Sequence, residues 1–274
     1  MSTPQQPPEG TGPAFARRHP IAAFVTVVLA LGWILLTIPN LTGLPQAPFL
    51  IVLNLVLLAT ALLITGWTGG PGAAGRLLAR VLRWRFSPWR YAVIMLGMPA
   101  ATVGVAAVTG TANLPGNWFA FGLSYLFQAI VFGALLVNLW EETAWTGFLQ
   151  SRLMNRHGLL IGSLLTAPWF LAVHIPLSFA PGWTWANAAV NLALLVVIAP
   201  VMRYLLGMHY LDTGGSVLAV GLQHAAFNAS ADLGHAGWEY TAGLVVLTVL
   251  VAAARHLTGW RARSRAAGRR EVTP

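Results

Sequence analysis

The chain has 274 residues, of which 57% are hydrophobic and only 8% are charged. Because soluble domains carry about 25% charged residues, this composition excludes a water-soluble globule, and the mean hydropathy of +0.68 indicates a polytopic membrane protein. The sequence contains no cysteine, which excludes a disulfide framework and a thiolate metal site. The formal charge of +9 comes from arginine, since no lysine is present.

Residues 1–16 are rich in proline and glutamine, which predicts a disordered N-terminal tail. Eight apolar runs follow, and each has, or nearly has, the roughly 20 residues needed to cross a hydrocarbon core about 30 Å thick. We therefore predict an all-α fold, a polytopic bundle of about eight transmembrane helices. The predicted helices are 21–38, 49–67, 91–108, 118–147, 159–177, 186–206, 214–229 and 238–256.

The arginines predict the orientation of this bundle. Eight crossings place both chain ends and the loops after the second, fourth and sixth helices on one side, and all sixteen arginines fall there, Arg203 among them. The positive-inside rule then places both termini in the cytoplasm. We expect the basic stretch 260–270 to contact anionic membrane lipid and not nucleic acid. The arginine-only composition favours a bacterial plasma membrane.

Glu141 and Glu142 are the only acidic residues between positions 10 and 211. A charged side chain at the centre of a membrane costs about 2.5–3.5 kcal/mol on insertion scales, so a functional role is expected. On a helix the two side chains point about 100° apart, so one can face a central site while the other approaches a neighbouring helix. Two close carboxylates in a poor dielectric do not both ionise readily, and one is expected to keep its proton.

Two further predicted helices carry polar residues at i, i+4 spacing. Phe170 and His174 share one face of the fifth helix, and His224 and Asn228 share one face of the seventh. A lone histidine or asparagine in a membrane helix is more often an interhelical contact worth about 0.6 kcal/mol, and we assign that structural role to histidines near segment ends, such as His209. Together with the glutamate pair, however, these groups supply a base, a water-positioning group and oxyanion donors for hydrolysis of an amide bond.

At these residues the chain resembles the CPBP family of intramembrane proteases, which includes the CAAX proteases and the bacteriocin-processing Abi proteins. Three motifs of this family occur in family order. The family usually has an arginine directly after the aromatic residue of its first motif, and Thr146 takes that place here. The matching residues are Glu141, Glu142, Trp145 and Gly147 for the first motif, Phe170 and His174 for the second, and His224 and Asn228 for the third.

The resemblance implies cleavage of a peptide bond inside the membrane, in a peptide or membrane-anchored protein substrate. Glu141 would be the general base, with His174 sharing the water. His224 and Asn228 would form the oxyanion hole, and Glu142 would be a supporting acid. We favour a mechanism without a cofactor, and the alternative is a zinc metalloprotease with Glu141, His174 and His224 as ligands.

These predictions divide the chain into the tail 1–16, three N-terminal helices in 17–117, a catalytic core in 118–230, a last helix in 231–258 and a basic tail in 259–274. Two alternatives remain open at this point. Thr146 would suit a catalytically inactive membrane scaffold, and the glutamate pair would suit a proton-coupled transporter.

The depths of the site residues in the membrane do not agree if the predicted helices are straight. At 1.5 Å per residue, His174 lies ~27 Å from Arg156, whereas Glu141 lies only ~16 Å from Arg152. We expect an interfacial stretch near 153–160 or a kink at Pro168.

Overall fold

The computed structural model describes residues 12–112, 116–180, 182–233 and 238–270. Every regular element in these ranges is a helix, which confirms the all-α prediction. Most of the predicted disordered tail lies outside the described residues, but its last part does not behave as predicted. Ala14–Arg18 forms a short helix, α1, and Ala16 is buried in an apolar core with residues of the next two helices.

Six helical stretches in the described residues are long and apolar enough to cross a membrane. The seventh predicted helix corresponds to α10 (Val217–Ala229), which has only 13 residues, and one stretch of 62 residues contains both the fourth and the fifth. The count of eight and the side of each terminus therefore remain predictions. The six stretches are α2 (Pro20–Thr42), α3 (Gln46–Gly69), α5 (Pro88–Thr109), Trp118–Phe179, α9 (Trp185–Asp212) and the Trp238–Gly259 part of α11 (Trp238–Arg270).

The long stretch Trp118–Phe179 is not one regular helix. Two π-helical segments flank the glutamate pair. Such segments are rare in proteins overall, but those that occur are often found at functional sites. The stretch reverses at Gly158, whose φ of 78° and ψ of 172° interrupt the helix. A Cβ on Gly162 would lie 2.5 Å from the backbone nitrogen of Met154, so the chain folds back closely on itself there. The segments are α6 (Trp118–Phe127), η1 (Gln128–Asn138), α7 (Leu139–Glu142), η2 (Thr143–Gln150), α8 (Ser151–His174) and η3 (Ile175–Phe179).

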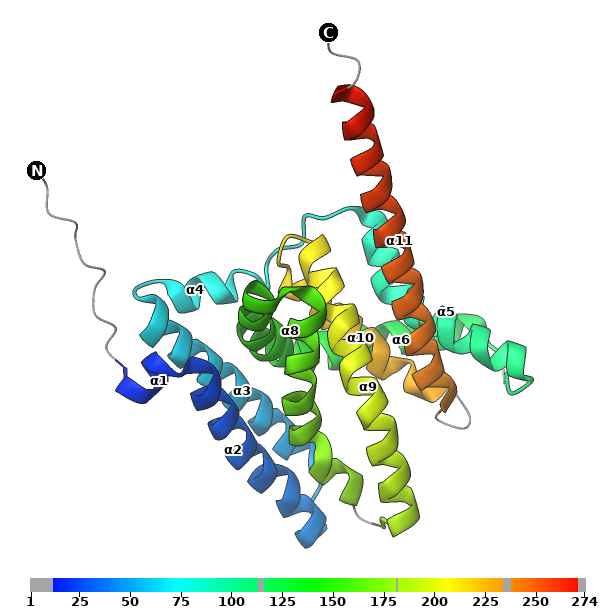
Figure 1. Ribbon diagram of the computed structural model, residues 1–274. Coiled ribbons are helices and arrows are strands. Elements are labelled where there is room, and N and C mark those ends of the chain that lie inside the picture. Colours follow the sequence, from blue (N-terminus) through cyan, green and yellow to red (C-terminus); the bar gives the residue numbers. More distant parts are fainter. Residues whose placement is uncertain (1–11, 113–115, 181, 234–237, 271–274) are drawn as a thin grey trace, which may run out of the picture.

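This reversal resolves the difficulty in depth between the glutamates and His174. The chain does not run straight from Arg156 to His174, since the helical path is broken at Gly158, inside the stretch 153–160 where an irregularity was expected. In Figure 1, α8 accordingly turns sharply before it descends beside α9. The break allows side chains from both halves of the stretch to meet at one level.

The two larger of four apolar clusters in the described residues hold most of the bundle together. The first joins α2 and α3 to η2 and α8, and the second joins α9 and α10 to α5 and α11. Figure 1 shows the same division, with α2 and α3 on one side, α5 and α11 on the other, and α8, α9 and α10 between them. The segments that carry the predicted site residues therefore lie at the centre of the fold.

Two glycines bring the glutamate segment against α10. A Cβ on Gly133 would lie 2.7 Å from the Cβ of Ala225, and one on Gly221 would lie 2.7 Å from Cδ2 of Leu139. Real Cβ atoms do not approach so closely, so glycine permits this spacing. The result is that the end of η1 and the whole of α7 lie directly beside the helix carrying His224.

One arginine does not occupy its predicted position. The sequence suggested that the sixth helix ends at 206 and that Arg203 contributes to the positive surface. The helix instead continues to Asp212, and Arg203 is fully buried inside it. It therefore cannot act as a surface charge that sets the orientation.

Candidate active site

Glu142 is a fully buried carboxylate held by three other side chains. Arg203 on α9 donates from Nη2 to Oε1 at 2.6 Å and from Nη1 to Oε2 at 3.1 Å. Nδ1 of His224 on α10 lies 2.7 Å from Oε1, and the hydroxyl of Thr146 donates to Oε2. The bidentate guanidinium balances the carboxylate charge and satisfies its oxygens, which a buried charge requires.

Glu141 has a different environment from its neighbour. Its Oε2 accepts a hydrogen bond of 3.3 Å from Nδ2 of Asn138, and no arginine among the described residues forms an ion pair with it. Its Oε1 lies 3.8 Å from Nε2 of His174, and its Oε2 lies 4.0 Å from Nδ1 of His224. The angle between successive helical side chains thus separates the pair as expected, with Glu142 toward α9 and Glu141 toward the two histidines.

The hydrogen bonds of His174 define its tautomer, and therefore whether the ring nitrogen that faces Glu141 donates or accepts. Its Nδ1 lies 2.6 Å from the backbone oxygen of Phe170. A carbonyl can only accept, so Nδ1 carries the hydrogen, and in the neutral ring Nε2 is an acceptor. Two acceptors, Nε2 and the Glu141 carboxylate, therefore face each other across 3.8 Å, which is too long for a direct hydrogen bond and suits a water that donates to both.

Phe170, the phenylalanine of the second motif, contacts both His174 and Arg203. Phe170 is buried, and its ring centroid lies 4.3 Å from that of His174. The guanidinium carbon of Arg203 lies 4.2 Å from the same centroid, a cation–π contact. Trp145 packs against the ring edge-on at 5.7 Å. Phe170 thus fixes the side chains of His174 and Arg203 relative to each other.

Asn228 and Asn138 extend the site toward a small cavity. Nδ2 of Asn228 donates to Oδ1 of Asn138 at 3.4 Å, while Nδ2 of Asn138 donates to Glu141. Asn228 is exposed although its helix is otherwise largely buried. The two asparagines line a cavity of about 270 Å³ between η1 and α10. The structure therefore brings together all five predicted site residues, which are Glu141, Glu142, His174, His224 and Asn228.

Two residues of this arrangement were not predicted from the sequence. Arg203 is the only charged residue in the apolar run 186–206, and an ionisable residue inside a membrane segment is by default a functional candidate. Asn138 precedes Glu141 by three positions, which places both on neighbouring turns of one helical face. Both signals were present, but a single arginine near a predicted helix end resembles an orientation signal.

The residues considered as zinc ligands do not fit a metal centre as they are arranged. Among the described parts of the chain, no three histidine, aspartate or glutamate side chains are grouped so that they could hold a metal ion. Nδ1 of His224 is engaged by Glu142, whose oxygens are also bound by Arg203 and Thr146. The guanidinium beside this group opposes a further cation electrostatically.

Comparison with protein families gives a match to the central part of the chain. Residues 123–230 match the family model described as Type II CAAX prenyl endopeptidase Rce1-like. A comparison with curated proteins finds no match. The matched region includes every residue of the site described above, from Asn138 to Asn228, whereas α2, α3, α5 and α11 lie outside it.

Proposed function

We propose that this integral membrane protein, of which residues 123–230 match the family model of type II CAAX prenyl endopeptidases, is an endopeptidase in which Glu141 activates a water. One observation carries the proposal. The Glu141 carboxylate and Nε2 of His174 face each other across 3.8 Å, with Nδ1 of His174 fixed by a backbone carbonyl. A water between them would donate one hydrogen to each and direct its lone pair outward.

The reaction follows from this arrangement. The water oxygen attacks the carbonyl carbon of the substrate, its proton passes to Glu141, and the carbonyl electron pair moves onto oxygen to give a tetrahedral oxyanion. His224 and Asn228 are assigned as the groups that stabilise that oxyanion, Asn228 through its side-chain amide. Collapse breaks the carbon–nitrogen bond, and Glu141 returns the proton to the leaving amine.

Glu142 acts through its neighbours in this mechanism. Its charge is balanced by Arg203, and its Oε1 accepts from Nδ1 of His224. A carboxylate in that position fixes the orientation of the imidazole. We therefore assign Glu142 as a positioning residue and Glu141 as the catalytic base.

The substrate that suits this site is a peptide held at the membrane. Asn138, which donates to Glu141, and Asn228 both line the small cavity between η1 and α10, and we assign this cavity as the entry for the substrate. An extended peptide segment there would place a carbonyl against the activated water, while a lipid or transmembrane anchor would hold the rest of the substrate in the bilayer.

A comparison of the two glutamates tests the assignment. The full chain in nanodiscs is incubated with a library of lipid-anchored and farnesylated peptides, and products are identified by mass spectrometry. Glu141→Gln should lower cleavage about 10²–10⁴-fold, the range for loss of a general base, with an unchanged unfolding temperature. Cleavage that survives Glu141→Gln in a folded protein would refute the mechanism. Proton flux in liposomes that persists in a His224→Ala variant would favour the transporter instead.

A further inference from the structure

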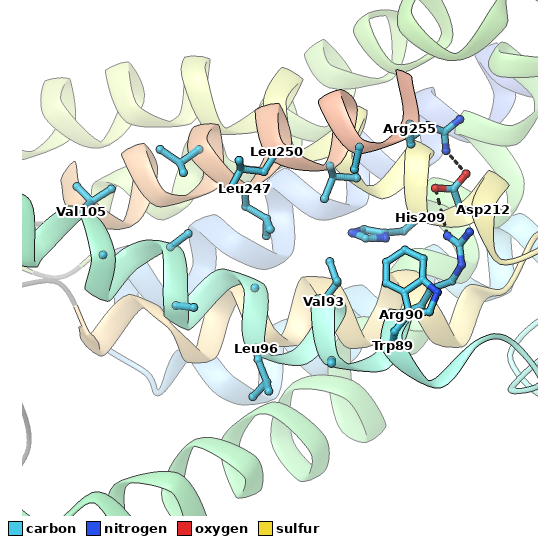
Figure 2. Close-up of a pocket in the computed structure, with 18 of the residues that line it drawn as sticks. Trp89, Arg90, Val93, Leu96, Val105, His209, Asp212, Leu247, Leu250 and Arg255 are labelled. Atoms are coloured by element: carbon cyan, nitrogen blue, oxygen red, sulfur yellow. Dashed lines mark hydrogen bonds and ion pairs between the residues drawn. The ribbon is translucent and has the colours of Figure 1, made fainter. Parts of the chain in front are cut away.

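A second cavity lies away from the site, between α5 and α11. Its volume is about 1220 Å³, larger than the 300–1,000 Å³ typical of small-molecule pockets. Figure 2 shows its apolar walls, with Val93, Leu96 and Val105 on α5 and Leu247 and Leu250 on α11. None of the residues of the candidate active site lines it.

One end of this groove is cationic. Asp212 at the end of α9 accepts from Arg255 through Oδ1, and its Oδ2 lies 3.2 Å from Nη1 of Arg90. All three side chains line the groove at the same end (Figure 2). Two guanidinium groups on a single carboxylate leave one positive charge without a partner in this cluster. An anionic group at this end would be favoured electrostatically.

His209 adds an unsatisfied polar atom at the same end. The residue is only 3% exposed, yet its Nε2 has no hydrogen-bond partner among the described residues. Figure 2 shows its ring turned into the groove beside Arg90 and Asp212. Burial of a polar atom without a partner is unfavourable, so a ligand with polar oxygens would satisfy it.

We propose that this groove is a specific site for one anionic phospholipid. Its phosphate would lie at Arg90, Arg255 and His209, and an acyl chain would run along the apolar walls of α5 and α11. The groove has a charged end and a continuous apolar channel beyond it. This combination fits a phospholipid, whereas a compact polar ligand would leave the apolar channel empty.

Helix α9 separates this groove from the active site. Arg203 and Asp212 are about two and a half turns apart on α9 and so point to opposite faces of it. Arg203 contacts Glu142, whereas Asp212 lines the groove. The hydrocarbon chain of a substrate bound at Glu141 would therefore not lie here, and the lipid site is independent of the proposed peptidase reaction.

Lipid selectivity is the first test. The full chain in detergent is mixed with equal amounts of phosphatidylglycerol and phosphatidylcholine, and bound lipid is counted by native mass spectrometry. One phosphatidylglycerol should be retained with about fivefold preference, the effect of one basic residue at a membrane surface. Arg90→Gln should abolish the preference, while Arg85→Gln, an exposed arginine stacked on Trp84, should keep it. Equal retention of both lipids by the wild type would overturn the proposal.

Occlusion of the groove provides a test that does not depend on charge. Gly104 lines the groove, and a Cβ added there meets nothing within 4 Å, so Gly104→Leu should fill the channel without disturbing the fold. Gly66 in α3 has the same open surroundings and lies outside the groove, which makes Gly66→Leu the matched control. Retention of phosphatidylglycerol should fall about tenfold in Gly104→Leu alone. An equal fall in both variants, or none in either, would refute the site.

Mapping on the wild-type chain needs no substitution. Phosphatidylglycerol carrying a diazirine on one acyl chain should crosslink to the faces of α5 and α11 that line the groove. Labels spread evenly over all lipid-facing helices would contradict the proposal. Displacement of the label by a farnesylated peptide would also overturn it, because the groove would then hold a substrate chain.

Discussion

Arg203 on α9 binds both carboxylate oxygens of Glu142 on α7, at 2.6 and 3.1 Å, and neither side chain is exposed to solvent. The family resemblance expects an arginine at position 146, where this chain has threonine. Thr146 donates to the same carboxylate. The guanidinium beside the glutamate pair is therefore supplied by a different helix, and its contact with Phe170 ties it to His174 as well.

Loss of Arg203 should destabilise the whole bundle. Arg203→Gln leaves Glu142 buried without its counter-charge, and breaking a buried pair in this way costs about 3–5 kcal/mol. Arg156→Gln removes an exposed arginine and is the control, with an expected change within about 0.5 kcal/mol. Thermal unfolding of both variants in detergent measures the difference, and similar unfolding temperatures would show that the ion pair contributes little.

The positive charge should be transferable to position 146. Thr146→Arg alone places a second guanidinium beside Arg203 and should lower peptidase activity. Arg203→Thr alone should lower it as well, because Glu142 and His224 lose their support. The double variant restores one guanidinium at the carboxylate and should regain at least part of the activity, measured against the same peptide library. A double variant no better than Arg203→Thr would show that the helix supplying the charge matters.

Asn138 should affect catalysis more than stability. It donates to Glu141 and accepts from Asn228, so Asn138→Ala releases both groups at once. Since each hydrogen bond is worth about 0.5–1.5 kcal/mol, kcat should fall about tenfold. Gln128→Ala alters the same cavity without touching either group and is the control. Equal kcat values for the two variants would remove Asn138 from the site.

Removal of metal should leave activity intact. Among the described residues, Glu141, His174 and His224 are not grouped so that they could hold a cation, and Arg203 is paired with the adjacent Glu142. Peptide cleavage by the purified protein should therefore be unchanged after treatment with EDTA or phenanthroline. Loss of activity that zinc restores would show that the site rearranges around a metal.

The surroundings of Glu141 and Glu142 could be predicted only in part from the sequence. The 100° separation of adjacent helical side chains requires the two carboxylates to face different surroundings, and the structure confirms it. Which glutamate would meet a cation was undetermined, because that depends on where α9 packs. For the same reason Arg203 was misassigned to the surface, since nothing in the apolar run marks the end of α9 at Asp212.

The sequence by itself determined that this is a helical membrane protein with a glutamate pair and two i, i+4 motifs, because hydropathy and helical spacing are local properties of the chain. Only the tertiary structure decided that Glu142 forms an ion pair with Arg203 and that Glu141 faces His174. It alone also showed that an apolar groove with a cationic end lies between α5 and α11. These contacts join residues on different helices, so they depend on packing that local sequence does not show; at the glutamate pair, close approach at Gly133 and Gly221 and the chain reversal at Gly158 bring the helices together.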